Sequence, residues 1–168
     1  NDIIHLIKES NIFLPHFHIP LQSGCDRILR LMKRKYNTKV YIDKINMINK
    51  NIPNACIGMD VIVGFPGETE ADFLTTCNFI KGLNINYLHV FSYSDRLGTV
   101  SSEISNKISD SKKMIRSRFL QNISNNKRLK FYKRNLSLTK KVLFESIINE
   151  EYLVGFSDNY IRIFVKGD

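Results

Sequence analysis

The chain has 168 residues, of which 43% are hydrophobic and 24% charged, enough for one sizeable core and a small appended module. No apolar run approaches the roughly 20 residues of a membrane helix, and no signal peptide is visible. These features exclude a membrane-spanning or secreted protein and favour a soluble, cytoplasmic one. Because the chain opens on Asn1 without an initiator methionine, we interpret it as a piece of something longer.

The first elements predicted along the chain are a helix and a strand. Residues 1–9 predict an incoming helix, and residues 12–19 alternate in hydrophobicity in the manner of a strand. His16 and His18 fall on one face of that strand, where a hydrogen-bonded structural role is expected ahead of metal ligation. A polar loop, Pro20 to Gly24, follows the strand.

Two helices are predicted next, over residues 26–35 and 38–49. The second begins at Thr38 as its cap, because threonine oxygens accept hydrogen bonds from the first free backbone amides. Its apolar residues recur at helical spacing and predict the face that packs inward: Val40, Tyr41, Ile45 and Ile48.

The stretch Ala55 to Asp72 predicts a buried strand that leads through a glycine-rich turn into a helix. Cys56 to Val63 is nearly all apolar and rich in β-branched residues, which favours a strand covered on both faces, as in parallel α/β sheets. The turn Gly64-Phe65-Pro66-Gly67 lets backbone approach a bound group closely. Thr69 followed by Asp72 predicts a capping box. Taken alone, this turn is more typical of an ordinary connection between strand and helix.

A third strand is predicted over Tyr87 to Tyr93. The order helix, strand, helix, helix, strand, helix, strand favours parallel strands joined by right-handed crossovers. Each strand ends in a polar or glycine-rich loop, at residues 22–24, 64–67 and 92–99. Because the carboxyl ends of parallel strands share one rim, we expect these loops to form one ligand site.

A strongly basic helix is predicted from about residue 110 to 136, with five inward residues: Ile115, Phe119, Ile123, Phe131 and Leu136. Between Ser111 and Phe144 the sequence has eleven lysines and arginines and no acidic residue, which accounts for the net charge of +9. Such a stripe indicates a polyanion, with nucleic acid as the first candidate, or equally a solvated helix face. The candidate RNA-binding residues are Lys127, Arg128, Lys130, Lys133, Arg134, Lys140 and Lys141.

The last part of the chain predicts a small antiparallel module. Residues 141–148, 152–156 and 160–165 are short β-rich runs separated by polar turns. About three strands fit before the end of the sequence, too few to close a barrel. We therefore expect this module to be partial.

The cysteines and histidines do not predict a metal site. Cys25, Cys56 and Cys77 are odd in number, far apart and without a C-x-x-C, so neither a disulfide framework nor a cluster motif is expected. The four histidines lack an H-x-x-x-H spacing.

Four strings place the sequence near a known family. HIPLQSG (residues 18–24), MKRKY (32–36), DVIVGFPGETEADF (60–73) and YLHVFSYSDRLGT (87–99), in this order, resemble the methylthiotransferase branch of the radical S-adenosylmethionine enzymes. The ending EEYLVGFSDNYIRIFV (150–165) is similar to the RNA-binding TRAM domain that follows the barrel in that branch. Within the branch, these strings are most similar to enzymes that methylthiolate threonylcarbamoyladenosine in tRNA. The isopentenyladenosine-tRNA and ribosomal-protein enzymes are near relatives.

The resemblance implies a cofactor site. The family uses S-adenosylmethionine with a [4Fe-4S] cluster, and the resemblance implies that Gln22 and Ser23 meet the ribose or methionine part while Arg34 binds its carboxylate. The alternative to a cofactor-binding role is a charge on the helix surface for Arg34. For Ile62 and Phe91 the alternative is packing in the core. The full implied set of cofactor-binding residues is Gln22, Ser23, Gly24, Arg34, Ile62, Gly64, Phe65, Pro66, Gly67, Phe91, Ser92 and Tyr93.

The sequence also departs from the family. It lacks the cluster-binding C-x-x-x-C-x-x-C of the first barrel strand and the domain before it, and no catalytic residue is identified. The resemblance therefore implies the second half of a TIM-type (β/α) barrel over residues 1–136 and a partial TRAM-like module over 137–168. We expect the chain alone to be inactive, with tRNA and the missing amino-terminal part of the enzyme as partners. A non-catalytic basic RNA-binding fragment is the alternative.

Overall fold

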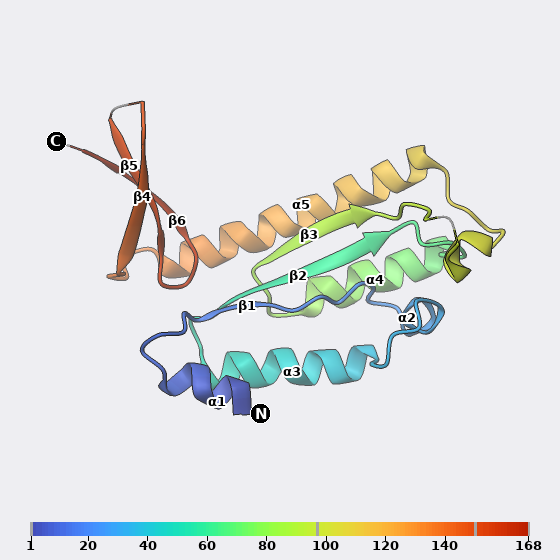
Figure 1. The fold of residues 1–168 in the computed structure, drawn as a ribbon, viewed down its shortest axis with the longest axis horizontal. Helices are drawn as coiled ribbons and strands as arrows, with labels where there is room; N and C mark the ends of the chain where they lie inside the picture. Colours follow the sequence, from blue (N-terminus) through green and yellow to red (C-terminus); the bar gives the residue numbers. More distant parts are fainter. Residues whose placement is uncertain (1, 97, 150, 168) are drawn as a thin grey trace.

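The computed structural model describes residues 2–96, 98–149 and 151–167. It contains a parallel sheet with its helices, followed by an antiparallel sheet that lies beyond one end of the strands (Figure 1). Within the described residues, no helix is long and apolar enough to cross a membrane. The elements are α1 (Asp2–Glu9), β1 (His16–His18), α2 (Asp26–Leu31), α3 (Thr38–Asn51), β2 (Cys56–Val63), α4 (Glu70–Gly82), β3 (Tyr87–Ser92), a 3-10 turn (Val100–Glu103), α5 (Asp110–Asn135), β4 (Val142–Ile148), β5 (Tyr152–Ser157) and β6 (Arg162–Lys166).

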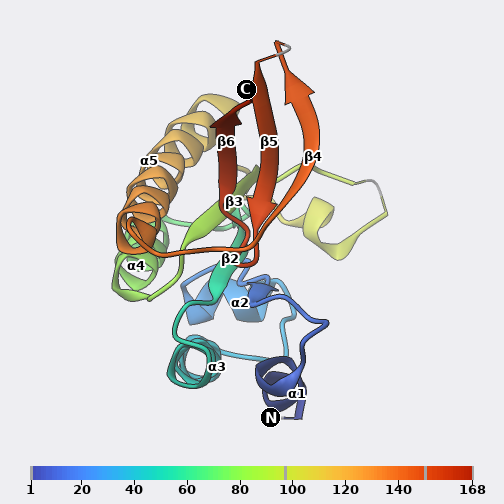
Figure 2. The same ribbon diagram turned by 90° about the vertical axis from the view of Figure 1, so that its left-hand side faces the viewer.

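The parallel sheet has the strand order β1-β2-β3, which confirms the predicted α/β alternation. Its centre is β2, whose bounds agree with the prediction. Helices α3, α4 and α5 all lie on one side of the sheet (Figure 2). Helices confined to one face are typical of barrels, whereas doubly wound sheets are covered on both faces.

The core fills the space between the sheet and these helices. Alternate residues of β2 point into it because side chains along a strand alternate between faces; they are Ile57, Met59, Val61 and Val63, which are all almost completely buried. They pack against Tyr41 and Ile45 of α3, Phe73 and Ile80 of α4, and Leu120 of α5. A capping box of Thr69 and Asp72 opens α4, as predicted.

The opposite face of the sheet bears histidine and tyrosine side chains. Gly58 lies beside Tyr87 in the ladder, and a Cβ at Gly58 would lie 2.1 Å from the Tyr87 ring. Only glycine therefore lets this ring cross β2 and reach His16, whose Nε2 lies 2.8 Å from the Tyr87 hydroxyl. His18 contacts Asp60, with 2.9 Å between Nε2 and Oδ1. The expected structural role of these histidines is consistent with the contacts.

Several predicted boundaries near the amino terminus were wrong. The strand expected over 12–19 is reduced to His16–His18, since residues 11–13 form a bend. The cap of α3 is Asn37, whose side chain accepts a hydrogen bond from the Val40 amide. Val40, expected inside, is exposed. In this helix the buried face therefore includes fewer residues than the apolar pattern predicted.

The inward face of α5 also differs from the prediction. Ile115, Phe119 and Leu136 are exposed. Buried in their place are Arg116, Leu120 and Ser124, together with the correctly predicted Ile123 and Phe131. The helix lies along the edge strand β3, where its Ser124 hydroxyl accepts a hydrogen bond from the Leu88 amide (2.8 Å) and donates one to the Leu88 carbonyl (3.1 Å). The backbone of an edge strand needs hydrogen-bond partners, and this need, more than the apolar pattern of α5, decides which face of the helix is buried.

The last three strands form an antiparallel sheet, as predicted, and its strand order is β4-β5-β6. It attaches to the rest of the protein through the turn between β5 and β6. There Ile161 packs with Cys56 and Phe131. The fully buried Asn159 donates hydrogen bonds from Nδ2 to the Asn135 side chain (2.9 Å) and the Asn54 carbonyl (3.2 Å). Both contacts involve the amino end of β2 or the carboxyl end of α5.

Candidate functional site

The three loops that follow the parallel strands lie on one rim, as predicted. The ladder continues beyond β1 at Gln22, whose amide donates to the Asp60 carbonyl and whose carbonyl accepts from the Ile62 amide. On the other side, the Tyr93 amide donates to the Val63 carbonyl at 2.9 Å. The carboxyl ends of all three strands are thus joined by backbone hydrogen bonds.

A cavity of about 260 Å³ opens at this rim. It brings together four of the predicted cofactor-binding residues: Ile62 near the end of β2, and Arg34, Phe65 and Tyr93 from three separate loops. The Phe65 and Tyr93 rings meet edge to face, with centroids 5.2 Å apart. The cavity thus has an apolar, aromatic wall and a guanidinium at its border. Its volume is slightly below the roughly 300 Å³ at which pockets for whole small ligands begin, so it can hold part of a larger molecule.

The position of Arg34 depends on how α2 ends. The sequence predicted a helix to residue 35, but α2 stops at Leu31. Lys33 adopts a left-handed conformation with φ of +54°, its amide donates to the Arg30 carbonyl, and the Arg34 amide donates to the Leu29 carbonyl, both at 2.9 Å. This is the Schellman pattern, which usually uses glycine. It turns the chain so that Arg34 lies on the cavity.

The glycine-rich turn is held by a buried ion pair that the sequence did not reveal. Gly64 has φ of +74°, and its amide donates to Oε2 of Glu68 at 2.8 Å. The same carboxylate accepts from Nη1 of Arg116 in α5 at 2.5 Å, and both side chains are at most 2% exposed. Arg116 also bonds Glu70 through Nη2 at 3.0 Å. Burial raises the pKa of Glu68, while the Gly64 amide and Arg116 favour its charged form.

The other predicted cofactor-binding residues lie away from this cavity. Ser23 is fully buried and its hydroxyl pairs with Thr76 at 3.2 Å, so it faces α4. Gly24 also packs on α4, where a Cβ would lie 3.0 Å from Phe79. Gln22 is held in the ladder with φ of +69°. The remaining members lie in the glycine-rich turn or on the exposed end of β3: buried Gly64 and Pro66, half-buried Gly67, and exposed Phe91 and Ser92.

The cysteines do not fit an iron–sulfur cluster. Among the described residues, no group of three or more histidine, cysteine or acidic side chains could hold a metal ion. Each thiol is buried and unreacted. Burial raises the pKa of Cys56 to about 12 and of Cys77 to about 11, whereas a cluster ligand must be a thiolate. Cys25 instead donates a hydrogen bond from Sγ to Asp72.

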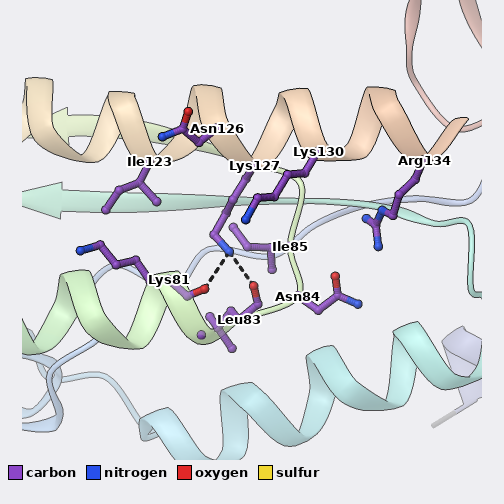
Figure 3. A pocket seen from close by; sticks show the side chains of 10 residues that line it. Lys81, Leu83, Asn84, Ile85, Ile123, Asn126, Lys127, Lys130 and Arg134 are labelled. Atoms are coloured by element: carbon purple, nitrogen blue, oxygen red, sulfur yellow. Dashed lines mark hydrogen bonds between the residues drawn. The ribbon is translucent and has the colours of Figure 1, made fainter. Parts of the chain in front are cut away.

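The candidate RNA-binding residues lie on several faces. Lys127 points toward the end of α4 and donates to the carbonyls of Leu83 (2.6 Å) and Lys81 (3.3 Å) (Figure 3). It thus caps a helix carboxyl end, where a cation is favourable. Burial, with the charge of Lys130 adding to it, lowers the pKa of Lys127 to about 8. Lys127 is therefore engaged within the protein.

Lys130 and Arg134 border the same hollow as Lys127, a cavity of about 490 Å³ between α5 and the end of α4 (Figure 3). Lys133 is exposed, and Arg128 faces a second cavity on the other side of the helix. Beyond the helix, Lys140 pairs with Asp158 at 3.2 Å, and Lys141 is exposed. The basic segment therefore does not form one continuous stripe.

Comparison with known proteins shows which proteins the chain is similar to. Residues 1–80 match the Radical SAM superfamily. The threonylcarbamoyladenosine tRNA methylthiotransferase MtaB of Aquifex aeolicus is 40% identical over 99% of this chain and 39% of its own length; that of Bacillus subtilis is 34% identical over 99% and 38%. The tRNA-2-methylthio-N(6)-dimethylallyladenosine synthase of Buchnera aphidicola is 37% identical over 99% and 38%. The chain thus spans about two fifths of the length of these curated relatives. Its first 80 residues are thus similar to the Radical SAM superfamily, and nearly its whole length is similar to tRNA methylthiotransferases.

Proposed function

We propose that this chain supplies part of the S-adenosylmethionine site and of the tRNA-binding surface of a tRNA methylthiotransferase. The observation that carries the proposal is the convergence of Arg34, Ile62, Phe65 and Tyr93 on one cavity at the carboxyl rim of a parallel sheet. Ligands of α/β proteins bind at this rim because the loops there vary independently of the scaffold. The similarity to relatives named for that activity supports this choice of ligand.

In this proposal each of these four side chains has a binding role. Ile62, Phe65 and Tyr93 pack against the adenine end of S-adenosylmethionine and exclude water from it. Arg34 holds the methionine carboxylate through charge-assisted hydrogen bonds. The glycine turn, held by Glu68 and Arg116, fixes the position of Phe65, the turn residue that lines the cavity. S-adenosylmethionine supplies the radical chemistry of the superfamily, which this chain's residues prepare by binding and orientation.

The architecture supports a division into two domains. Residues 1–136 form a parallel sheet with helices on a single face, as expected for the second half of a (β/α) barrel. The described part of residues 137–168 contains three antiparallel strands, as expected for part of a TRAM-like module. Since the cysteines do not fit a cluster, we propose that the chain alone is inactive and that its cluster ligands belong to a further part of the enzyme.

Threonylcarbamoyladenosine at position 37 of tRNA is the proposed substrate. MtaB enzymes are named for it, and one of them is 40% identical to this chain. Dimethylallyladenosine is the second candidate, because a synthase of the 2-methylthio form is 37% identical. Deleting the gene and analysing tRNA nucleosides by mass spectrometry separates the two: the 2-methylthio group should disappear from threonylcarbamoyladenosine alone. Unchanged tRNA nucleosides would favour a ribosomal-protein substrate or a non-catalytic RNA-binding fragment.

Cofactor binding is tested in the chain itself. Titration calorimetry with S-adenosylmethionine should show binding that Arg34→Gln weakens about tenfold, because a charged hydrogen bond contributes roughly 1.5–3 kcal/mol. Arg30→Gln is the matched control, since Arg30 is a nearby arginine, in the last turn of α2, that lies outside the cavity. Equal binding by both variants would reject the assignment of Arg34.

A further inference from the structure

A second cavity, of about 380 Å³, lies at the amino ends of the parallel strands, opposite the carboxyl rim. Its floor is formed by β1, β2 and β3, one wall by α5, and the other by the antiparallel sheet, which stands beyond this end of the strands (Figure 1). The proposed S-adenosylmethionine site makes no use of this cavity.

The α5 wall presents an arginine and a tyrosine. Arg128 and Tyr132 are four residues apart and therefore lie on one face of the helix. The guanidinium of Arg128 lies 6.0 Å from the ring centroid of Tyr87 on the floor. Tyr132 is 37% exposed, and its ring is tilted by 42° to the ring of Phe131. Among the described residues no aromatic ring is stacked in parallel on Tyr132.

The opposite wall is a stack of three rings from distant parts of the chain. Tyr160 lies between Phe156 and His16, with centroid distances of 4.8 and 4.2 Å and interplanar angles of 19° and 10°. Tyr160 has φ of +64°, a conformation that is uncommon for a bulky side chain. The turn imposes it: the Tyr160 amide donates to the Ser157 carbonyl, and the Ile161 amide donates to the Ser157 hydroxyl.

The walls are fixed to each other. Asn159, beside Tyr160, is fully buried and joins the turn to the end of α5 and to the segment before β2. His16 is held from below by the Tyr87 hydroxyl at 2.8 Å. The cavity is therefore built in advance and needs little reorganisation to accept a ligand, which favours binding.

This cavity is positively charged because two arginines that line it have no acidic partner among the described residues. Arg128 and Arg162 both line it, and neither forms an ion pair with the residues that the structure describes. The mixture of aromatic faces with unpaired guanidinium groups suits an unstacked nucleotide, whose base stacks on a ring while the phosphate meets the arginines. The cavity's size accommodates one nucleotide and is far too small for a duplex.

We propose that this cavity binds one unpaired nucleotide of RNA, with the base against Tyr132 and the phosphate between Arg128 and Arg162. The inference rests on the proposed RNA-binding role and adds to it a site for single-stranded RNA at the junction of the two sheets. It predicts that binding depends on an aromatic ring as well as on charge.

The test measures binding of the 168-residue chain to a short, unstructured, fluorescein-labelled RNA by anisotropy. Tyr132→Leu should weaken binding at least about fivefold, since stacking on an aromatic side chain contributes roughly 1–3 kcal/mol per base. Tyr132→Phe keeps the ring and should bind as the parent chain does. Both substitutions lie on an exposed helix position, and circular dichroism confirms that the fold is retained.

Two arginine variants separate the contribution of the cavity to RNA binding from that of the overall positive charge of the helix. Arg128→Gln should weaken binding several-fold, whereas Arg118→Gln, the same change on the same helix outside the cavity, should have a much smaller effect. The proposal is overturned if the chain does not bind the RNA, if Tyr132→Leu matches Tyr132→Phe, or if the two arginine variants are equally weak. Equal or tighter binding of a blunt RNA duplex would also overturn it.

These results are independent of the proposed catalytic function. Binding that depends on Tyr132 but accompanies unchanged tRNA nucleosides in the gene deletion would retain the site and reject the methylthiotransferase. Loss of the methylthio group in the deletion, together with RNA binding that does not depend on the Tyr132 ring, would retain the methylthiotransferase and reject the site.

Discussion

The two halves of α5 have similar composition but do different work. In the first half, Arg116 is buried in an ion pair with Glu68, and Lys112 and Lys113 pair with Glu70 and Asp110. In the second half, neutral amides hold the antiparallel sheet, and Arg128, Lys130, Lys133 and Arg134 form no ion pair within the described residues. Arg116 of the first half therefore stabilises the glycine turn, whereas these four charges of the second half remain available to a partner.

The largest effect is expected at the ion pair of the first half. Arg116→Leu leaves the Glu68 carboxylate buried without its partner, which should lower the free energy of unfolding by roughly 3–5 kcal/mol. Chemical denaturation measures this change. Arg118→Leu, exposed two residues further on, should change stability by no more than about 0.5 kcal/mol. Similar losses in both variants would show that Arg116 acts only as a generic helix residue.

The amide anchor of the second half should matter less. Asn159→Leu leaves the Asn135 side chain and the Asn54 carbonyl without their donor, at a cost of about 2 kcal/mol. Thermal unfolding gives the loss, and limited proteolysis should show earlier cleavage between α5 and β4. Asn125→Leu, at an exposed position of α5, serves as the control. Unaltered proteolysis would mean that apolar packing alone fixes the antiparallel sheet.

RNA binding should distinguish the halves by its salt dependence. Replacing Lys130, Lys133 and Arg134 with glutamine should reduce the slope of log affinity against log salt by about 2, since each phosphate contact with single-stranded RNA contributes roughly 0.7. The matched triple variant of the first half replaces Lys112, Lys113 and Arg118 with glutamine. It should retain most of the salt dependence of the parent chain. Equal reductions would show that RNA responds to the whole helix and not to its second half.

The smallest effect concerns Lys127 and appears as a pH dependence. Its folded pKa is about 8, below the roughly 10.4 of an unfolded lysine. Between these values the unfolded chain binds more protons, so the free energy of unfolding should rise with pH, by on the order of 1 kcal/mol. Lys127→Met should lack this rise, and Lys133→Met, at an exposed position, should keep it. Urea denaturation from pH 7 to 10 compares them; a rise that persists in Lys127→Met would assign it to another group.

The elements predicted best are those whose local pattern and tertiary environment agree. β2 and the capping box of α4 were predicted correctly because a nearly continuous apolar run and a Thr-x-x-Asp start leave few alternatives. The end of α2 was not predictable, because Lys33 occupies a left-handed position where a glycine would have marked it. The pairing of Glu68 with Arg116 joins residues 48 positions apart, and no local pattern encodes it.

The sequence by itself determined the α/β alternation, the place of the ligand loops on one rim and the concentration of positive charge in one helix. These follow from hydrophobic periodicity, turn chemistry and composition, which are local properties. Only the tertiary structure decided that Arg34 and not Ser23 lies on the rim cavity, that Arg116 and Lys127 are engaged internally, and that rings from β1, α5 and the antiparallel sheet line a second cavity. The reason is physical: which face of a helix or strand is buried, and which charges find partners there, depends on elements far away in the chain.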